Sequence, residues 1–144
     1  MSSGLIIIVD DNPTLRKMYT DFLTAHGYTV LTAKSGAEGM NLLLNCTPKV
    51  LILDIAMPDL DGIETCKQVR ILHGNDMPIL FLTAFNDIHT LRDCMHAGGD
   101  DYLIKSGNLQ SILERIRFWT KAANRQEARM HRKEVVREVD NAMT

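Results

Sequence analysis

The chain reads Leu5-Ile6-Ile7-Ile8-Val9-Asp10-Asp11 close to its amino terminus, an apolar run that ends directly on two carboxylates. If this run is a strand of a parallel sheet, both acids lie at the carboxyl edge of that sheet. Three later apolar runs also end on a polar side chain: residues 50–53 on Asp54, residues 78–82 on Thr83, and residues 102–104 on Lys105. The pattern predicts that three carboxylates, a hydroxyl and an ammonium converge at one edge.

The apolar runs alternate with longer stretches of helical period, which is typical of βα units and a parallel sheet. Residues 49–54 are almost wholly apolar, as expected of a central strand, whereas residues 28–33 alternate and fit a strand near an edge. The pattern predicts an α/β fold with a (βα)5 doubly wound, five-stranded parallel sheet. The expected strands are 4–9, 28–33, 49–54, 78–83 and 101–105.

Length and composition indicate one globular domain with a short appendage. The chain has 144 residues, 45% hydrophobic and 24% charged, and a formal net charge of −2. A slightly acidic balance argues against direct nucleic-acid binding. Three widely spaced cysteines suggest reduced thiols rather than a disulfide framework. Because neither a secretory leader nor a run of about 18 apolar residues occurs, we expect a cytoplasmic protein without a membrane partner.

The composition changes near residue 121. Helix-forming residues continue, without glycine or proline, so the sequence predicts that the last helix extends into residues 121–144. Only a few large apolar residues occur there, which suggests a stripe too thin to pack well on the domain. A solvated helix, a dimerisation helix and a linker to an output domain are the three alternatives for this charged tail, and we place the domain itself at 4–120.

The converging residues suit phosphoryl chemistry. Asp10, Asp11 and Asp54 would repel one another without a cation, and a hard divalent ion such as Mg²⁺ prefers oxygen ligands. Asp54 would then offer a nucleophilic oxygen, with Lys105 neutralising charge and Thr83 supplying a hydroxyl. Each residue alone has an ordinary explanation, since acids at strand ends often cap helices. Their occurrence at four strand ends favours a functional site.

Four segments resemble one family, the receiver domain of bacterial two-component response regulators. They are Ile8-Val9-Asp10-Asp11-Asn12, the run from Leu51 through Asp54 to Gly62, Leu82-Thr83-Ala84, and the run from Ala97 to Lys105. The likeness spans residues 4 to about 120. It implies a flavodoxin/CheY-like fold with strand order 2-1-3-4-5, here with an extended C-terminal helix.

The resemblance also implies roles for the site residues. Asp54 would accept a phosphoryl group from a histidine kinase or phosphotransfer protein, and the chain would catalyse only that transfer. Mg²⁺ would be held by Asp11, Asp54 and the backbone carbonyl of Ala56, with Asp10 close by. Thr83 and Ala84 would contact the phosphoryl group beside Lys105, and Tyr102 would change rotamer. A downstream output domain or protein would read the face of the fourth helix, fifth strand and last helix, with homodimerisation through the last helix or tail as an alternative.

Three departures from the family pattern affect these expectations. Ser106 stands where proline usually follows the lysine, so either a trans peptide or a strained cis peptide is expected there. Ala56 and Phe85 replace side chains that are often polar, and neither can orient an attacking water, which predicts slow self-dephosphorylation. The segment after Lys105 lacks the run typical of receivers fused to winged-helix DNA-binding domains.

Two other functions compete with a receiver. An Mg²⁺-dependent phosphatase on a similar sheet would need a general acid two residues after the nucleophile, where Ala56 stands. A flavodoxin-like FMN binder would need Ser, Thr and Gly in the first loop, where two acids would repel a phosphate. Both alternatives fit the sequence less well.

Overall fold

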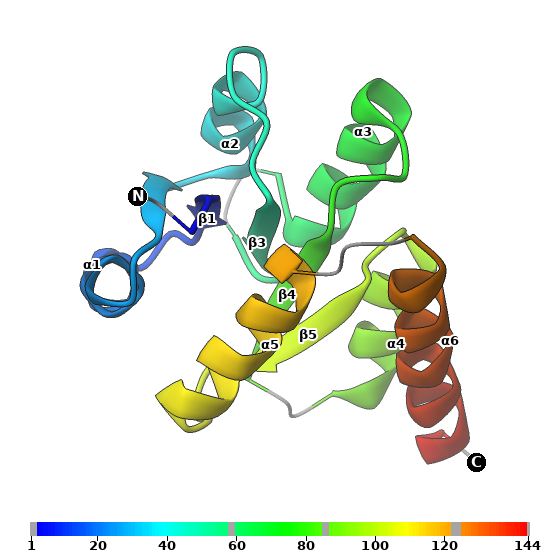
Figure 1. Ribbon diagram of the computed structural model, residues 1–144. Helices are drawn as coiled ribbons and strands as arrows, with labels where there is room; N and C mark the ends of the chain where they lie inside the picture. The colour runs from blue at the N-terminus through cyan, green and yellow to red at the C-terminus, as the bar shows by residue number, and fades with distance from the viewer. Residues whose placement is uncertain (1–2, 58–59, 85–86, 122–124, 144) are drawn as a thin grey trace.

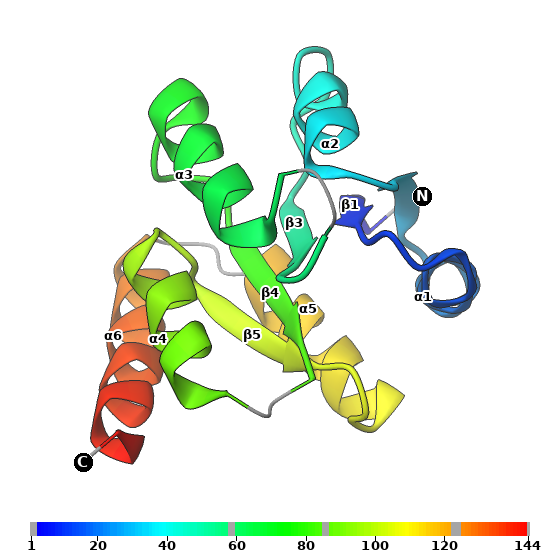
Figure 2. The ribbon, with the colours of Figure 1, turned by 180° about the vertical axis from the view of Figure 1, so that it is seen from behind.

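The computed structural model describes residues 3–57, 60–84, 87–121 and 125–143. Within these ranges, five parallel strands form one sheet in the order β2-β1-β3-β4-β5, with helices on both faces (Figures 1 and 2). The strands are β1 (Leu5–Val9), β2 (Thr29–Ala33), β3 (Val50–Asp54), β4 (Ile79–Thr83) and β5 (Asp101–Ile104). The predicted fold class and strand order are confirmed. No helix in the described part of the chain is long and apolar enough to cross a membrane.

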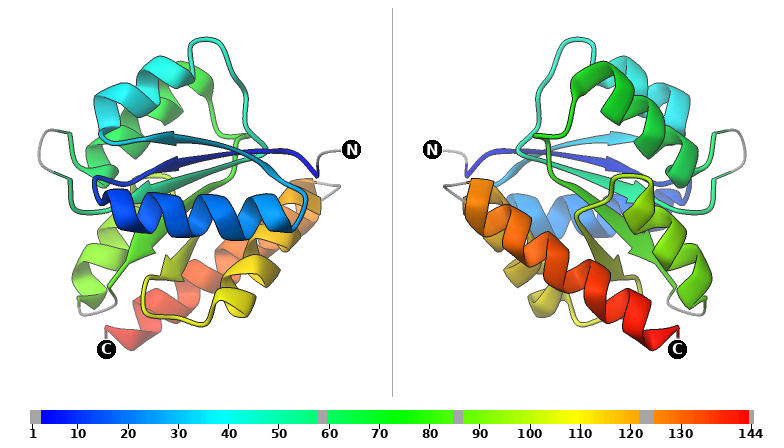
Figure 3. Two further views of the ribbon diagram at one scale, coloured as in Figure 1. Left: turned by 90° about the vertical axis from the view of Figure 1, so that its left-hand side faces the viewer. Right: turned by 90° about the vertical axis from the view of Figure 1, so that its right-hand side faces the viewer.

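Alternate side chains of the central strands pack on opposite faces, as the pleat requires. Ile6 and Ile8 contribute to a core with α1 (Pro13–Ala25) and α5 (Leu109–Lys121). Ile7 and Val9 contribute to the core on the other face, under α2 (Gly36–Leu42), α3 (Gly62–His73) and α4 (Ile88–His96). Both faces of β1 and β3 are therefore covered (Figure 3), which explains why those runs are continuously apolar.

Short polar side chains begin the helices where the sequence places them. Asn12 Oδ1 accepts from the N–H groups of Thr14 and Leu15, and Pro13 occupies the first helical position. Asp87 caps α4 in the same manner. These caps fix where each connection leaves the carboxyl edge of the sheet, and so they position the loops around the candidate site.

The carboxyl-terminal segment differs from expectation. α5 ends at Lys121 and a separate helix, α6 (Arg125–Ala142), runs back along α4 (Figures 1 and 2). The predicted C-terminal helix exists, but it neither continues α5 nor lies free in solvent. Val135 and Val139 are 3% and 2% exposed and pack on α4, so the apolar stripe does pack on the domain. The α4 residues that meet it are Leu91 and Met95.

Candidate functional site

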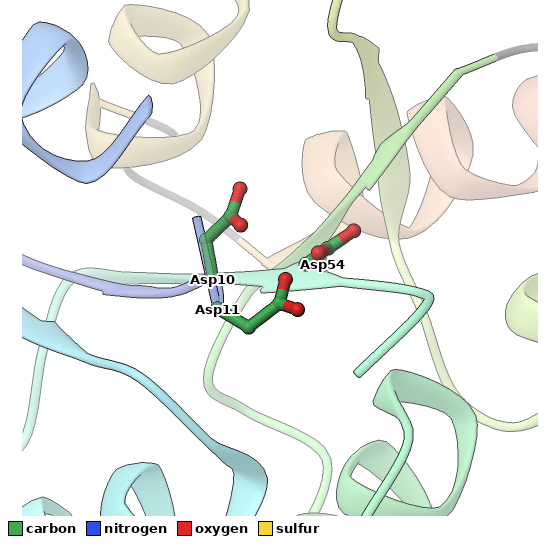
Figure 4. Close-up of side chains that lie close together, drawn as sticks. All are labelled: Asp10, Asp11 and Asp54. Atoms are coloured by element: carbon green, nitrogen blue, oxygen red, sulfur yellow. The ribbon is translucent and has the colours of Figure 1, made fainter. Parts of the chain in front are cut away.

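The three predicted acids meet at the carboxyl edge of β1 and β3. Val9 is paired with Leu53, so the next residue on each strand, Asp10 and Asp54, lies beside the other. One carboxylate oxygen from each of Asp10, Asp11 and Asp54 lies within 4.8 Å of the others (Figure 4). The side chains of Asp10 and Asp54 are buried, whereas that of Asp11 is exposed. Of the three acids, only Asp11 is exposed to solvent.

Asn12 and Arg16 hold Asp10 in place, and of these two the sequence motifs include only Asn12. The N–H of Asn12 donates to Asp10 Oδ1 at 2.9 Å. The Arg16 guanidinium, one turn into α1, donates to the backbone carbonyl of Asp10 at 2.7 Å. Asp10 is thus fixed through both its side chain and its backbone. Arg16 could not be identified from spacing, because an arginine in the first turns of a helix is ordinarily a solvated residue.

Lys105 reaches the acids from the end of β5. Its Nζ lies 2.8 Å from Asp54 Oδ1 and 3.7 Å from Asp10 Oδ2. The N–H of Lys105 donates to the carbonyl of Thr83 at 2.8 Å, so the ends of β4 and β5 are tied together. Thr83 is buried at the last position of β4. The structure thus brings all five strand-end residues to one edge, as predicted.

One ammonium does not satisfy three carboxylates. Asp10 Oδ2 and Asp54 Oδ2 are buried and accept no hydrogen bond from the described residues. Burial raises the pKa of Asp54 to about 6; the Lys105 hydrogen bond opposes the rise, and the charges of Asp10 and Asp11 add to it. Buried acceptors without donors are costly, and hard oxygen ligands suit Mg²⁺. These residues therefore fit a divalent cation, with the buried oxygens as available ligands.

The loop after β3 ends at Gly62, where the packing leaves no room for a residue larger than glycine. Gly62 begins α3, and its N–H donates to the Ile55 carbonyl at 2.9 Å. A Cβ at Gly62 would lie 2.2 Å from the carbonyl oxygen of Asp54. Glycine at this position therefore permits α3 to support the strand end that carries Asp54. Ala56 lies between them, exposed.

The remaining predicted positions are distributed around this edge. Ala84 follows Thr83 and is exposed, while Phe85 falls outside the described residues. The Lys105–Ser106 peptide is trans, since no described peptide bond is cis, and this resolves the two alternatives for that bond. Tyr102 is half-buried on β5, with the Arg115 guanidinium 5.5 Å from its ring centre.

Open parallel α/β sheets bind their ligands at the carboxyl ends of the strands, and here that edge carries an acidic cluster, a lysine and a buried threonine. The profile of the response regulator receiver domain matches residues 6–117. The chain belongs to this family of receiver domains from two-component systems. The resemblance stated from the sequence is confirmed.

Similar proteins agree with this assignment. Response regulator MprA of Mycobacterium sp. strain KMS is 40% identical over 112 residues, which cover 78% of this chain and 48% of that protein. The chain therefore spans about half the length of the curated relatives it matches. Among solved structures, chemotaxis protein CheY4 of Vibrio cholerae superposes with a TM-score of 0.75 at 29% identity, covering 79% of this chain and 96% of that one.

A second solved structure bears on the acidic cluster. Response regulator TrrA of Thermotoga maritima, determined in complex with Mg²⁺ and BeF, superposes with a TM-score of 0.73. It is 30% identical, and the match covers 83% of this chain and 99% of that one. The fold that carries the acids in the present chain is therefore shared with a protein that holds Mg²⁺.

Proposed function

We propose that Asp54 accepts a phosphoryl group from a histidine kinase or a phosphotransfer protein, in a reaction that depends on Mg²⁺. One observation carries this proposal: Asp54 is a buried carboxylate that pairs through Oδ1 with Lys105, while its Oδ2 has no hydrogen-bond donor among the residues that the structure describes. A structural acid would use both oxygens. Here one oxygen remains available beside two further acids.

Each residue of the site has a separate role in the phosphoryl transfer. A carboxylate oxygen of Asp54 forms the new bond to phosphorus while the bond from phosphorus to the donor's histidine nitrogen breaks, and the imidazole leaves. Lys105 lies where its ammonium stabilises charge on the transferring oxygens. Asp11, Asp54 and the carbonyl of Ala56 would hold Mg²⁺, with Asp10 nearby, and the bound ion would offset the repulsion between carboxylates and phosphoryl group.

Side chains of β4 and β5 would then respond to the phosphoryl group on Asp54. The Thr83 hydroxyl would move toward the acyl phosphate, next to Ala84, and Tyr102 would change rotamer. Thr83 and Tyr102 face the same side of the sheet, because Phe81 is paired with Tyr102 and Thr83 lies two residues further along β4. This shared face supports coupled movement of the two side chains.

The larger context follows from the relatives' length. We infer that residues 4–120 form the receiver, and that the chain acts on a downstream output domain or protein. Residues 121–144 would be a link to such a domain or a dimerisation segment. We expect no direct contact with nucleic acid, since the chain has a formal net charge of −2.

The test is phosphorylation by a small donor. The full chain is incubated with Mg²⁺ and acetyl phosphate, and its intact mass is followed. We expect the mass of one phosphoryl group to be gained, and the gain to disappear with EDTA or in Asp54→Ala. The matched control, Asp21→Ala, removes an exposed acid of α1 and should label normally. Multiple turnover of a phosphate ester would instead favour the phosphatase alternative, and an unlabelled wild type would contradict the proposal.

A further inference from the structure

α6 covers the surface formed by α4, β5 and α5 (Figure 3). Its first half is held by polar contacts to the end of α4, the loop after it and the start of β5. The Arg132 guanidinium donates to the carbonyls of Gly99 at 3.0 Å and Met95 at 2.9 Å. His131 Nε2 lies 3.2 Å from Asp101 Oδ2, and its ring stacks at a tilt on Phe118 of α5. α6 therefore contacts all three elements of this surface.

The second half of α6 is held mainly by apolar packing on α4. Val135 and Val139 are one helical turn apart and bury themselves on Leu91 and Met95. At the end of the helix, the Asp140 carboxylate lies 3.6 Å from Arg92 Nε and from His96 Nε2 of α4. These ion pairs are about half-exposed and contribute little. The two valines are the principal attachment of this half.

Tyr102 connects this attachment to the sheet. Its ring packs against the cluster of Leu91, Met95, Val135 and Val139. Burial raises the pKa of Tyr102; Arg115 opposes the rise, and the Glu138 carboxylate of α6 adds to it. The tyrosine on β5 is therefore a direct neighbour of α6. Any rotation of its ring toward Thr83 would withdraw apolar surface from the cluster that holds Val135 and Val139.

We propose that α6 occupies the α4–β5–α5 surface in the resting state, and that a phosphoryl group on Asp54 releases it through Tyr102. This inference rests on the proposed function of Asp54. The released state exposes a surface that the resting state buries, so α6 acts as an intramolecular inhibitor of contacts made there. A phosphoryl group can shift this equilibrium only by favouring one state, and the altered Tyr102 position supplies that difference.

The attachment of α6 is weak enough to be switched. Apart from Ala128 and three valines, Val135, Val136 and Val139, most of the helix is polar, and its Met130 side chain is 59% exposed. A helix held by two buried valines, the Arg132 hydrogen bonds and a few ion pairs opens at a lower free energy than the central strands, which are buried on both faces. Loss of the contact with the Tyr102 ring would therefore remove a large fraction of the apolar contacts that hold α6 on the domain.

The experiment is amide hydrogen exchange on the full chain with Mg²⁺, before and after acetyl phosphate, with phosphorylation followed by intact mass in the same samples. We expect exchange within residues 125–142 to accelerate by roughly tenfold or more on phosphorylation, while β1 and β3 stay protected. Asp54→Ala should abolish the acceleration. In Tyr102→Ala, exchange of α6 should already be fast before phosphorylation.

Val139→Asp tests the attachment without phosphorylation. This variant should release α6 at rest, with β1 and β3 still protected; if α6 exchange equals that of the wild type, the valines do not hold the helix and the inference fails. Arg132→Gln tests the polar attachment in the same way, because it removes the guanidinium that binds the Gly99 and Met95 carbonyls and leaves the apolar cluster unchanged. Exchange of α6 should again be faster than in the wild type before phosphorylation. Labelled wild type with unchanged α6 exchange overturns this inference alone. Absence of any label overturns the proposed function and this inference together.

Discussion

Replacing Asp54 with asparagine should stabilise the metal-free protein above about pH 6, because the change removes a buried charge that Lys105 only partly offsets. The pKa of Asp54 is raised from 3.8 to about 6, mainly by burial. Such a rise corresponds to about 3 kcal/mol of preference for the neutral carboxyl in the folded state. Asparagine is neutral and retains an oxygen that accepts from Lys105, so it should recover up to that amount.

The pH dependence has a definite sign. Between about pH 4 and pH 6 the folded state binds more protons at Asp54 than the unfolded state, so this contribution to stability is lost as pH rises through that window. The stability difference between Asp54→Asn and wild type should be about 3 kcal/mol at pH 8 and approach zero below about pH 4. Other groups titrate equally in both proteins, so their effect cancels in the difference between the two free energies of unfolding.

The assay is urea unfolding in EDTA, followed by fluorescence of the single tryptophan, Trp119, which is 4% exposed and changes environment on unfolding. Asp21→Asn, which breaks an exposed pair with Lys17, is the matched control and should change stability by less than about 0.5 kcal/mol. Added Mg²⁺ should stabilise wild type and remove the advantage of Asp54→Asn, because the ion binds only the folded site. A variant no more stable than wild type at pH 8, or a pH-independent difference, would refute this reasoning.

Three further predictions concern other parts of the molecule. Asp101→Asn should destabilise the protein by about 3 kcal/mol in urea, because Arg115 and the buried Trp119 Nε1–H lose a carboxylate partner; stability equal to wild type would show that the network contributes nothing. Gly62→Ala should lower both stability and the rate of labelling by acetyl phosphate, because its Cβ would displace the Asp54 carbonyl, and normal labelling would contradict that close packing. The phosphorylated chain, once freed of donor, should lose its phosphoryl group over minutes or longer, because Ala56 cannot orient a water; Ala56→Asn should shorten the half-life, and a wild-type half-life of seconds would disprove this.

The sheet and the site were predictable because they depend on local pattern. Each βα unit buries a short apolar run, and in a parallel sheet the residue after each run must lie at the same edge. Asp10 and Asp54 could therefore be placed side by side from their positions after two strands. The same reasoning places Lys105 at this edge, but it does not give the distance from Lys105 to each acid.

The position of α6 could not be predicted in that way. Its own apolar content is low, and the sequence alone suggested a helix that packs poorly on the domain. Two of its valines are nevertheless buried, because Leu91 and Met95, at least 40 residues earlier, present a buried apolar surface to them. The pairing of His131 with Asp101 is equally non-local. The apolar period of a helix shows which of its side chains can be buried, but it does not show which surface of the protein they pack against.

Trapping the acyl phosphate at its residue tests the central claim most directly. Wild-type protein treated with Mg²⁺ and acetyl phosphate is reduced with borohydride, digested, and the peptides are sequenced by mass spectrometry. Reduction of an aspartyl phosphate leaves homoserine in place of the aspartate. The account predicts homoserine at position 54 alone, and only when Mg²⁺ is present. Homoserine at position 10 or 11 with Asp54 intact, or conversion independent of Mg²⁺, would contradict it.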